Sequence, residues 1–90
     1  MARLLIKGEA AALGANTGAA NIFSNARLVR VVNTNTSTAY LVTLVASVGG
    51  AVLGSFHLAP STSVELEKEP LNGIFAADGA VKGTAVGFTN

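Results

Sequence analysis

The sequence predicts an all-β protein: a small antiparallel β-sandwich or barrel, Ig-like or jelly-roll-like, of about seven short strands with an extended N-terminal arm. Short runs rich in Val, Leu and Thr recur along the 90 residues, and clusters of Gly, Asn, Ser, Asp and Pro separate them. Hydrophobic residues make up 50% of the chain and charged residues only 12%, whereas about 25% is usual for charged residues in a soluble domain. With no Cys in the chain, neither disulfides nor a Cys-rich zinc site can stabilise so small a core.

The alternation of side chains defines the expected strands. The segment 63–69 is the clearest, because Val64 and Leu66 point to one face while its glutamates point to the other. Asn33 to Ser37 form a polar turn, and Asp78-Gly79 is a tight-turn signal. The expected strands are 3–7, a strand within 22–33 that is centred on 28–32, and then 38–46, 51–59, 63–69, 74–77 and 80–89.

The chain divides into an arm and a domain. Residues 1–21 form an N-terminal arm, or a first strand plus loop, and residues 22–90 form the β-sandwich domain. Within the arm, 8–21 is rich in Ala, Gly, Asn and Thr, and a short helix at 9–13 or a weak early strand is compatible with it. Because this segment has little to bury by itself, we expect it to become ordered only against a partner.

The central strands are apolar on both faces. In 38–46, Tyr40, Val42 and Leu44 share one face, while Leu41, Thr43 and Val45 share the other. A 90-residue sandwich cannot bury both faces alone, so we expect a partner surface: a homo-oligomer (dimer or trimer) or a larger scaffold. The candidate interface residues are Arg27, Arg30, Tyr40, Leu41, Val45, Leu53, His57, Lys68 and Phe75.

Charge and hydropathy bear on nucleic acid and membrane partners. The Lys and Arg residues are scattered singly, without the basic stripe of a nucleic-acid binder. The uncharged stretch 39–56 approaches the length of a membrane helix, but its Val and Thr content and the central Gly49-Gly50 favour a hairpin. At the N-terminus, Lys7 interrupts the apolar run too early for a signal peptide. We therefore expect no nucleic-acid partner, no membrane span and no secretion signal.

The residues that carry chemistry do not form a catalytic or metal-binding pattern. His57 is the one histidine, and no nucleophile–carboxylate pair accompanies it in the sequence. Glu65, Glu67 and Glu69 read as a solvated strand face, whereas Lys68 falls on the opposite, buried face. The Lys68 stem can pack there while its ammonium reaches water or a partner carboxylate. We expect no enzyme activity, no cofactor and no metal site.

Residues 22–90 resemble small β-rich structural proteins from the virions of tailed phages, especially phages of marine bacteria and cyanobacteria. The likeness lies in 28–34, 40–44, 54–58, 64–70, 74–77 and 81–90, with "EKEPLNGIFAA" at 67–77 as its best-matching piece. Asn72 stands where such proteins usually have an acid.

The resemblance implies a non-enzymatic head decoration or cement protein. Such a protein is made in the host cytoplasm and bound to the capsid surface of the virion. Its partners would be the major capsid protein or other virion proteins. The alternative is a tail or neck accessory protein, or a fibre-associated module that binds host-surface carbohydrate.

Overall fold

The fold is all-β and antiparallel, as the sequence predicts. The structure is a computed structural model that describes residues 3–14, 16, 18 and 20–89. Its strands are β1 (Arg3–Ile6), β2 (Ala11–Ala12), β3 (Leu28–Asn33), β4 (Tyr40–Val45), β5 (Val52–Leu58), β6 (Ser63–Glu67), β7 (Gly73–Ala76) and β8 (Val81–Thr89). No α-helix is present in the described part of the chain.

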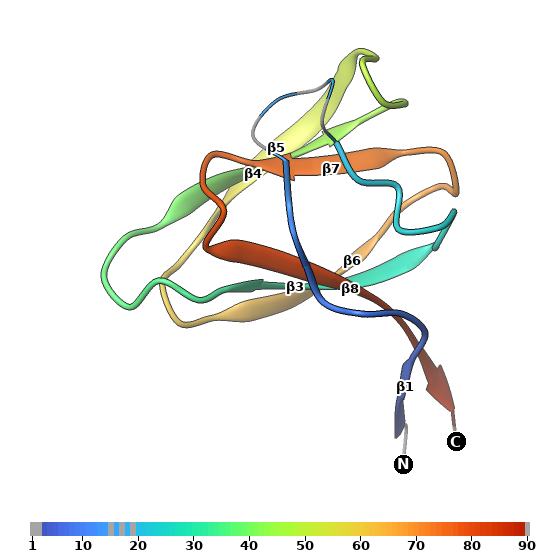
Figure 1. The fold of residues 1–90 in the computed structure, drawn as a ribbon, viewed down its shortest axis with the longest axis horizontal. Coiled ribbons are helices and arrows are strands. Elements are labelled where there is room, and N and C mark those ends of the chain that lie inside the picture. The colour runs from blue at the N-terminus through green and yellow to red at the C-terminus, as the bar shows by residue number, and fades with distance from the viewer. Residues whose placement is uncertain (1–2, 15, 17, 19, 90) are drawn as a thin grey trace.

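The strands form two sheets that pack face to face as a small sandwich (Figure 1). The first sheet has the order β1-β8-β3-β6, with β2 also paired to β8. The second sheet has the order β5-β4-β7. The polar turn after Asn33 carries the chain from β3 in the first sheet to β4 in the second.

The core lies between the sheets and is built from small aliphatic side chains. Val29 and Val31 of β3 face Val42 of β4 and Ile74 of β7, and each of the four is fully buried. Their alternation in sequence follows from the two-residue period of a strand, which places every second side chain on the inner face. The partly buried residues Tyr40, Leu44, Phe56, Val64 and Leu66 pack against this cluster.

Each of the seven expected strands overlaps one observed strand. In the segment 9–13 the possible helix is wrong and the weak early strand is correct, because β2 lies there and pairs with Lys82 and Gly83 of β8. The strand expected within 22–33 and centred on 28–32 is confirmed as β3, which begins at Leu28. The preceding Phe23, Ser24 and Asn25 all have φ between 53° and 64°, a left-handed conformation that no strand accommodates.

Much of the N-terminal segment packs on the same chain. β1 and β2 pair with β8, and Gly14 and Asn21 bridge to β7. Leu13 and Ala20 are also buried. Backbone hydrogen bonds join Lys7 and Leu13 to β8 and join Gly14 and Asn21 to β7. That the segment becomes ordered only against a partner stays a prediction.

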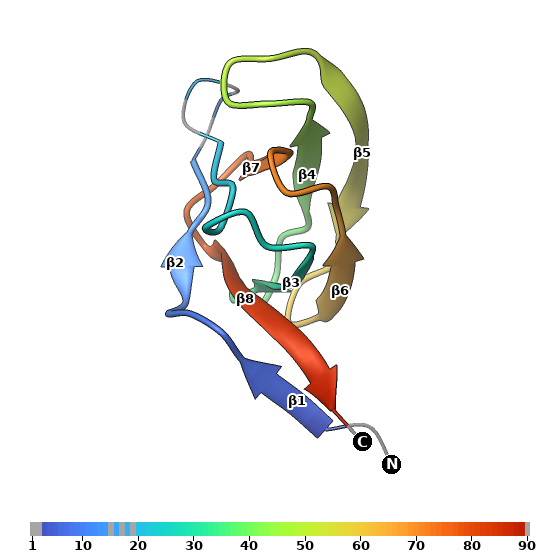
Figure 2. The same cartoon turned by 90° about the vertical axis from the view of Figure 1, so that its right-hand side faces the viewer.

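The ladder between β1 and the end of β8 projects away from the two sheets (Figure 2). Leu5 is 47% exposed and Ile6 is 70% exposed on this ribbon. An isolated two-stranded ribbon is only marginally stable in water, and this ribbon also exposes apolar side chains to water.

Candidate interaction surfaces

The outer face of the second sheet gathers several of the expected interface residues. In the register of β4 with its neighbours, Leu41 lies opposite His57, and Thr43 lies between Ser55 and Phe75. The alternate residues, such as Val42, point into the core. We call the five residues Leu41, Thr43, Ser55, His57 and Phe75 the uncharged face, because β4, β5 and β7 contain no Lys, Arg, Asp or Glu.

The uncharged face is partly accessible to solvent. Leu41 is 38% exposed, His57 and Ser55 are exposed, and Phe75 is half-buried. Thr43, on the central strand, is only 5% exposed. Removing such a surface from water requires no charged group to be desolvated, so it is suited to contact with another protein.

The opposite face of the sandwich is charged. Arg30 of β3 lies opposite Glu65 of β6, and their side chains form an ion pair of 3.2 Å. The Arg30 guanidinium also donates to Ser63 Oγ at 3.4 Å. Arg27 and Glu69 form a second, more exposed pair at 3.4 Å. Exposed pairs such as these contribute little to stability. They do pair the charged side chains of an outer face that is exposed to water.

A second apolar surface lies along the hairpin of β4 and β5. Val52 is 60% exposed and Leu53 is 57% exposed on β5, and Val48 in the connecting turn is 51% exposed. The ladder register skips Leu53, so this residue forms a β-bulge. Of these three residues, only Leu53 was predicted from the sequence to lie in an interface. Val48 and Val52 lie in the long uncharged segment of the sequence, and this feature could have predicted their exposure.

Three of the proposed interface residues are buried or half-buried within the protein. Val45 is fully buried, because the backbone at Gly73 and the Ala20 region close over the end of β4. Tyr40 packs against the core, and its hydroxyl accepts a hydrogen bond from Asn35 Nδ2. Lys68 is 4% exposed. The buried Val45 is therefore not exposed to a partner, contrary to expectation. Lys68 lies on the buried face that the sequence predicts, and Tyr40 is only half-accessible.

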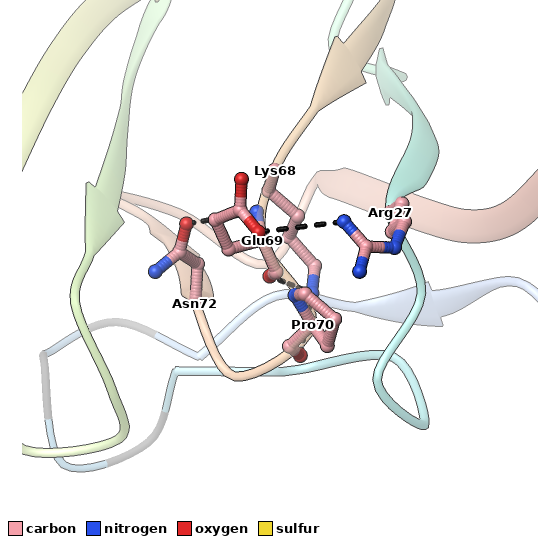
Figure 3. Close-up of polar contacts among 5 residues, drawn as sticks. All are labelled: Arg27, Lys68, Glu69, Pro70 and Asn72. Atoms are coloured by element: carbon pink, nitrogen blue, oxygen red, sulfur yellow. Dashed lines mark hydrogen bonds and ion pairs between the residues drawn. The ribbon is translucent and has the colours of Figure 1, made fainter.

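The Lys68 ammonium is used within its own turn (Figure 3). Lys68 Nζ donates to the carbonyl oxygens of Pro70 at 3.1 Å and Glu69 at 3.3 Å, instead of reaching a partner carboxylate. Burial lowers the pKa of this ammonium, because desolvation penalises its charged form. In the same turn, Asn72 Oδ1 accepts from the Glu69 amide at 2.9 Å, and Asn72 Nδ2 donates to the Ala46 carbonyl at 3.1 Å.

A shallow groove of about 490 Å³ runs beside the left-handed turn. Its lining includes Lys7, Phe23, Arg27 and Gly87. The two cationic side chains in this lining, Lys7 and Arg27, are far apart in the sequence. The pairing of β1 with β8 brings Lys7 to the groove. No polar group buried in the groove is left without a partner among the described residues.

Among residues 3–14, 16, 18 and 20–89, no three His, Cys, Asp or Glu side chains cluster in a way that could hold a metal ion. The same residues contain no helix long and apolar enough to cross a membrane. Comparison with family models, with curated proteins and with solved structures finds no match for this chain.

Proposed function

We propose that this protein is a non-enzymatic structural protein of a phage virion, a head decoration protein that binds the outer surface of the capsid shell. The observation that carries the proposal is the contrast between the two outer faces of the sandwich. One face holds the Arg30–Glu65 pair, and the other carries no charged residue on its strands.

This contrast supports docking through the uncharged face. Apolar area removed from water contributes about 25 cal/mol per Å², and Leu41 and Phe75 offer such area. His57 and Ser55 add groups that can donate or accept hydrogen bonds without carrying a fixed charge. The charged face then stays in solvent, where its ion pairs are already formed.

The mechanism requires only binding. A ligand that binds the assembled shell and not its free subunits shifts the equilibrium toward the shell, by an amount that grows with its concentration above the dissociation constant. Many copies bound across contacts between capsid subunits would therefore make disassembly less favourable. The resemblance of residues 22–90 to virion proteins supports the shell as the partner.

Co-sedimentation of the purified protein with phage heads that lack it tests the proposal. Wild-type protein is expected to pellet with the heads. Leu41→Lys is expected to weaken binding at least tenfold, since a buried leucine contributes about 1.5–3 kcal/mol and each ~1.4 kcal/mol is tenfold in affinity.

Leu71→Lys is the matched control, because Leu71 is also exposed but lies in the turn between β6 and β7. It is expected to bind heads like the wild type. Failure of the wild type to pellet with heads, or electron micrographs that place bound protein on the tail instead, would overturn the proposal. Equal losses in the two leucine variants would contradict the assignment of the docking face.

A further inference from the structure

β5 is a free edge of the second sheet. Within residues 3–14, 16, 18 and 20–89, it pairs with β4 on one side and with no strand on the other, and Figure 2 shows it along the outside of the molecule. Val52, Leu53, Gly54 and Ser55 are all exposed. In an antiparallel strand, alternate residues direct their N–H and C=O groups away from the existing partner, so this edge presents backbone groups ready to pair with another strand.

The other edges described by the structure are protected in ways that natural proteins commonly use. β6 carries Glu65 and Glu67. β2 is only two residues long, and β1 has four residues and is followed directly by Lys7.

The outer edge of β7 is covered. Ile74 exchanges backbone hydrogen bonds with Asn21 at 2.9 and 3.0 Å, and the Ala76 amide donates to Gly14 at 2.9 Å. β5 is not covered in this way: it contains no charged residue and no proline, and four consecutive residues along it are exposed. The bulge at Leu53 is its one irregularity, and the residues from Gly54 onward pair regularly with β4.

We propose that β5 pairs antiparallel with β5 of a second copy of this chain, about a two-fold axis near the middle of the strand. Charge favours an identical partner. Between Arg30 and Glu65 the chain has no Lys, Arg, Asp or Glu, so two copies bring these segments together without like-charge repulsion. An antiparallel strand pair of one sequence has the two-fold symmetry of a closed dimer.

The two-fold symmetry also places the start of each β5 beside the end of the other β5. Under a two-fold near Ser55, the exposed Val52 and Leu53 at the start of one β5 lie beside the His57 and Leu58 end of the other. Both side chains lose water-exposed apolar area in this arrangement. The sheet β5-β4-β7 then continues without interruption from one copy into the next.

The pairing has a consequence for docking that rests on the proposed function. The two-fold axis of an antiparallel strand pair is perpendicular to the sheet, so the uncharged faces of both copies lie on the same side. A dimer would then present two docking faces to one shell, and binding of the first would raise the effective concentration of the second.

The contact is small. Seven residues of β5 extend over about 24 Å. A single strand pair of this length buries less surface area than a permanent interface does. We therefore expect a monomer–dimer equilibrium that depends on concentration. Sedimentation velocity of the full chain over a series of rising concentrations is expected to show the mass doubling from monomer to dimer.

Leu53→Lys tests the edge. Leu53 is exposed, so the variant retains its β-type circular dichroism. Each introduced lysine would lie beside the His57 end of the other copy and would have to be desolvated there, so the variant is expected to remain monomeric throughout. Leu71→Lys is the control and is expected to dimerise like the wild type. Amide hydrogen exchange adds a backbone readout: amides of β5 are expected to gain protection at high concentration in the wild type and not in Leu53→Lys.

A wild type that stays monomeric, a trimer as the first oligomer, or loss of the dimer in Leu71→Lys would overturn the proposal. Leu41→Lys separates it from shell docking. That variant alters the uncharged face and not the β5 edge, so it is expected to dimerise normally and fail to bind heads. A protein that dimerises but ignores heads would leave the edge pairing supported and the proposed function refuted.

Discussion

The ring of Phe23 lies directly over Gly83. A Cβ at Gly83 would be 2.6 Å from Phe23 Cζ and 3.0 Å from Phe23 Cε1. The left-handed turn at 23–25 delivers this ring to the inner face of β8, where Val81 and Ala85 are also buried. The absence of a side chain at residue 83 is thus what allows Phe23 to join the core.

Gly83→Ala is expected to destabilise the protein by about 1–3 kcal/mol, because the added methyl overpacks the core against an aromatic ring. In a Phe23→Ala background the same change is expected to cost much less, since the obstructing ring is gone. Denaturant unfolding of the single and double variants measures this coupling. Gly54→Ala is the control, because a Cβ there meets nothing within 4 Å; a loss as large as that of Gly83→Ala would contradict the packing argument.

Asn33→Asp is expected to destabilise the protein by more than about 3 kcal/mol at neutral pH, because a buried unpaired charge costs more than the ~1–3 kcal/mol of a neutral unpaired group. Asn33 is fully buried, and its Nδ2 donates to the carbonyl oxygens of Thr38 at 2.9 Å and Leu58 at 3.0 Å. A carboxylate would face both oxygens with no proton to donate.

Thermal unfolding at neutral and acidic pH measures the effect of Asn33→Asp. The loss should shrink in acid, where the carboxyl regains a donor. Asn25→Asp makes the same chemical change at an exposed position and is expected to be nearly neutral. Similar losses in both variants would show that burial of Asn33 is not the cause.

The side chain of Asn72 holds the turn between β6 and β7 through two hydrogen bonds. Asn72→Asp keeps the acceptor for the Glu69 amide but loses the donor to Ala46, whereas Asn72→Ala loses both. Each hydrogen bond contributes about 0.5–1.5 kcal/mol, so stability should fall from wild type to Asn72→Asp to Asn72→Ala. Urea unfolding at high salt, which screens repulsion from Glu69, measures the order. An Asn72→Asp variant as stable as the wild type would show that the Ala46 bond contributes nothing.

Lys68 predicts a dependence of stability on alkaline pH. Its folded-state pKa is lowered by burial, so the unfolded chain binds more protons between that lowered pKa and the ordinary lysine range. Stability contributed by this residue therefore rises with pH across that window. Lys68→Met removes the effect, and wild type is expected to gain stability relative to the variant as pH increases. Unfolding curves of both proteins that stay parallel through this range would contradict the prediction.

The strands and the core were predictable because they depend on local pattern. Alternation in 63–69 placed Glu65 and Glu67 outward, as observed, and the turn at Asp78 was marked by its Asp-Gly pair, where the Asp78 carboxylate now accepts from the Ala80 amide. Leu41 and His57 were expected at the surface and lie opposite each other on the uncharged face.

Other features could not be read from local pattern. Val45 continues the alternation of Leu41 and Thr43, but Gly73 and the covering Ala20 region bury it. The Lys68 ammonium finds carbonyl oxygens in its own turn, which depends on how the chain folds back through Pro70. The left-handed run at 23–25, which precedes β3, follows no alternation of apolar residues.

By itself, the sequence determined that the chain is all-β, where its strands lie and which segment lacks charge, because these depend on side-chain period and turn residues along a few consecutive positions. The tertiary structure alone decided that the N-terminal residues cover β7 and pair with β8, that one outer face is charged and the other is not, and that β5 is left as an uncovered edge. Those features come from pairing between segments far apart in the chain, and the order of strands in a sheet is set by the packing of the whole molecule.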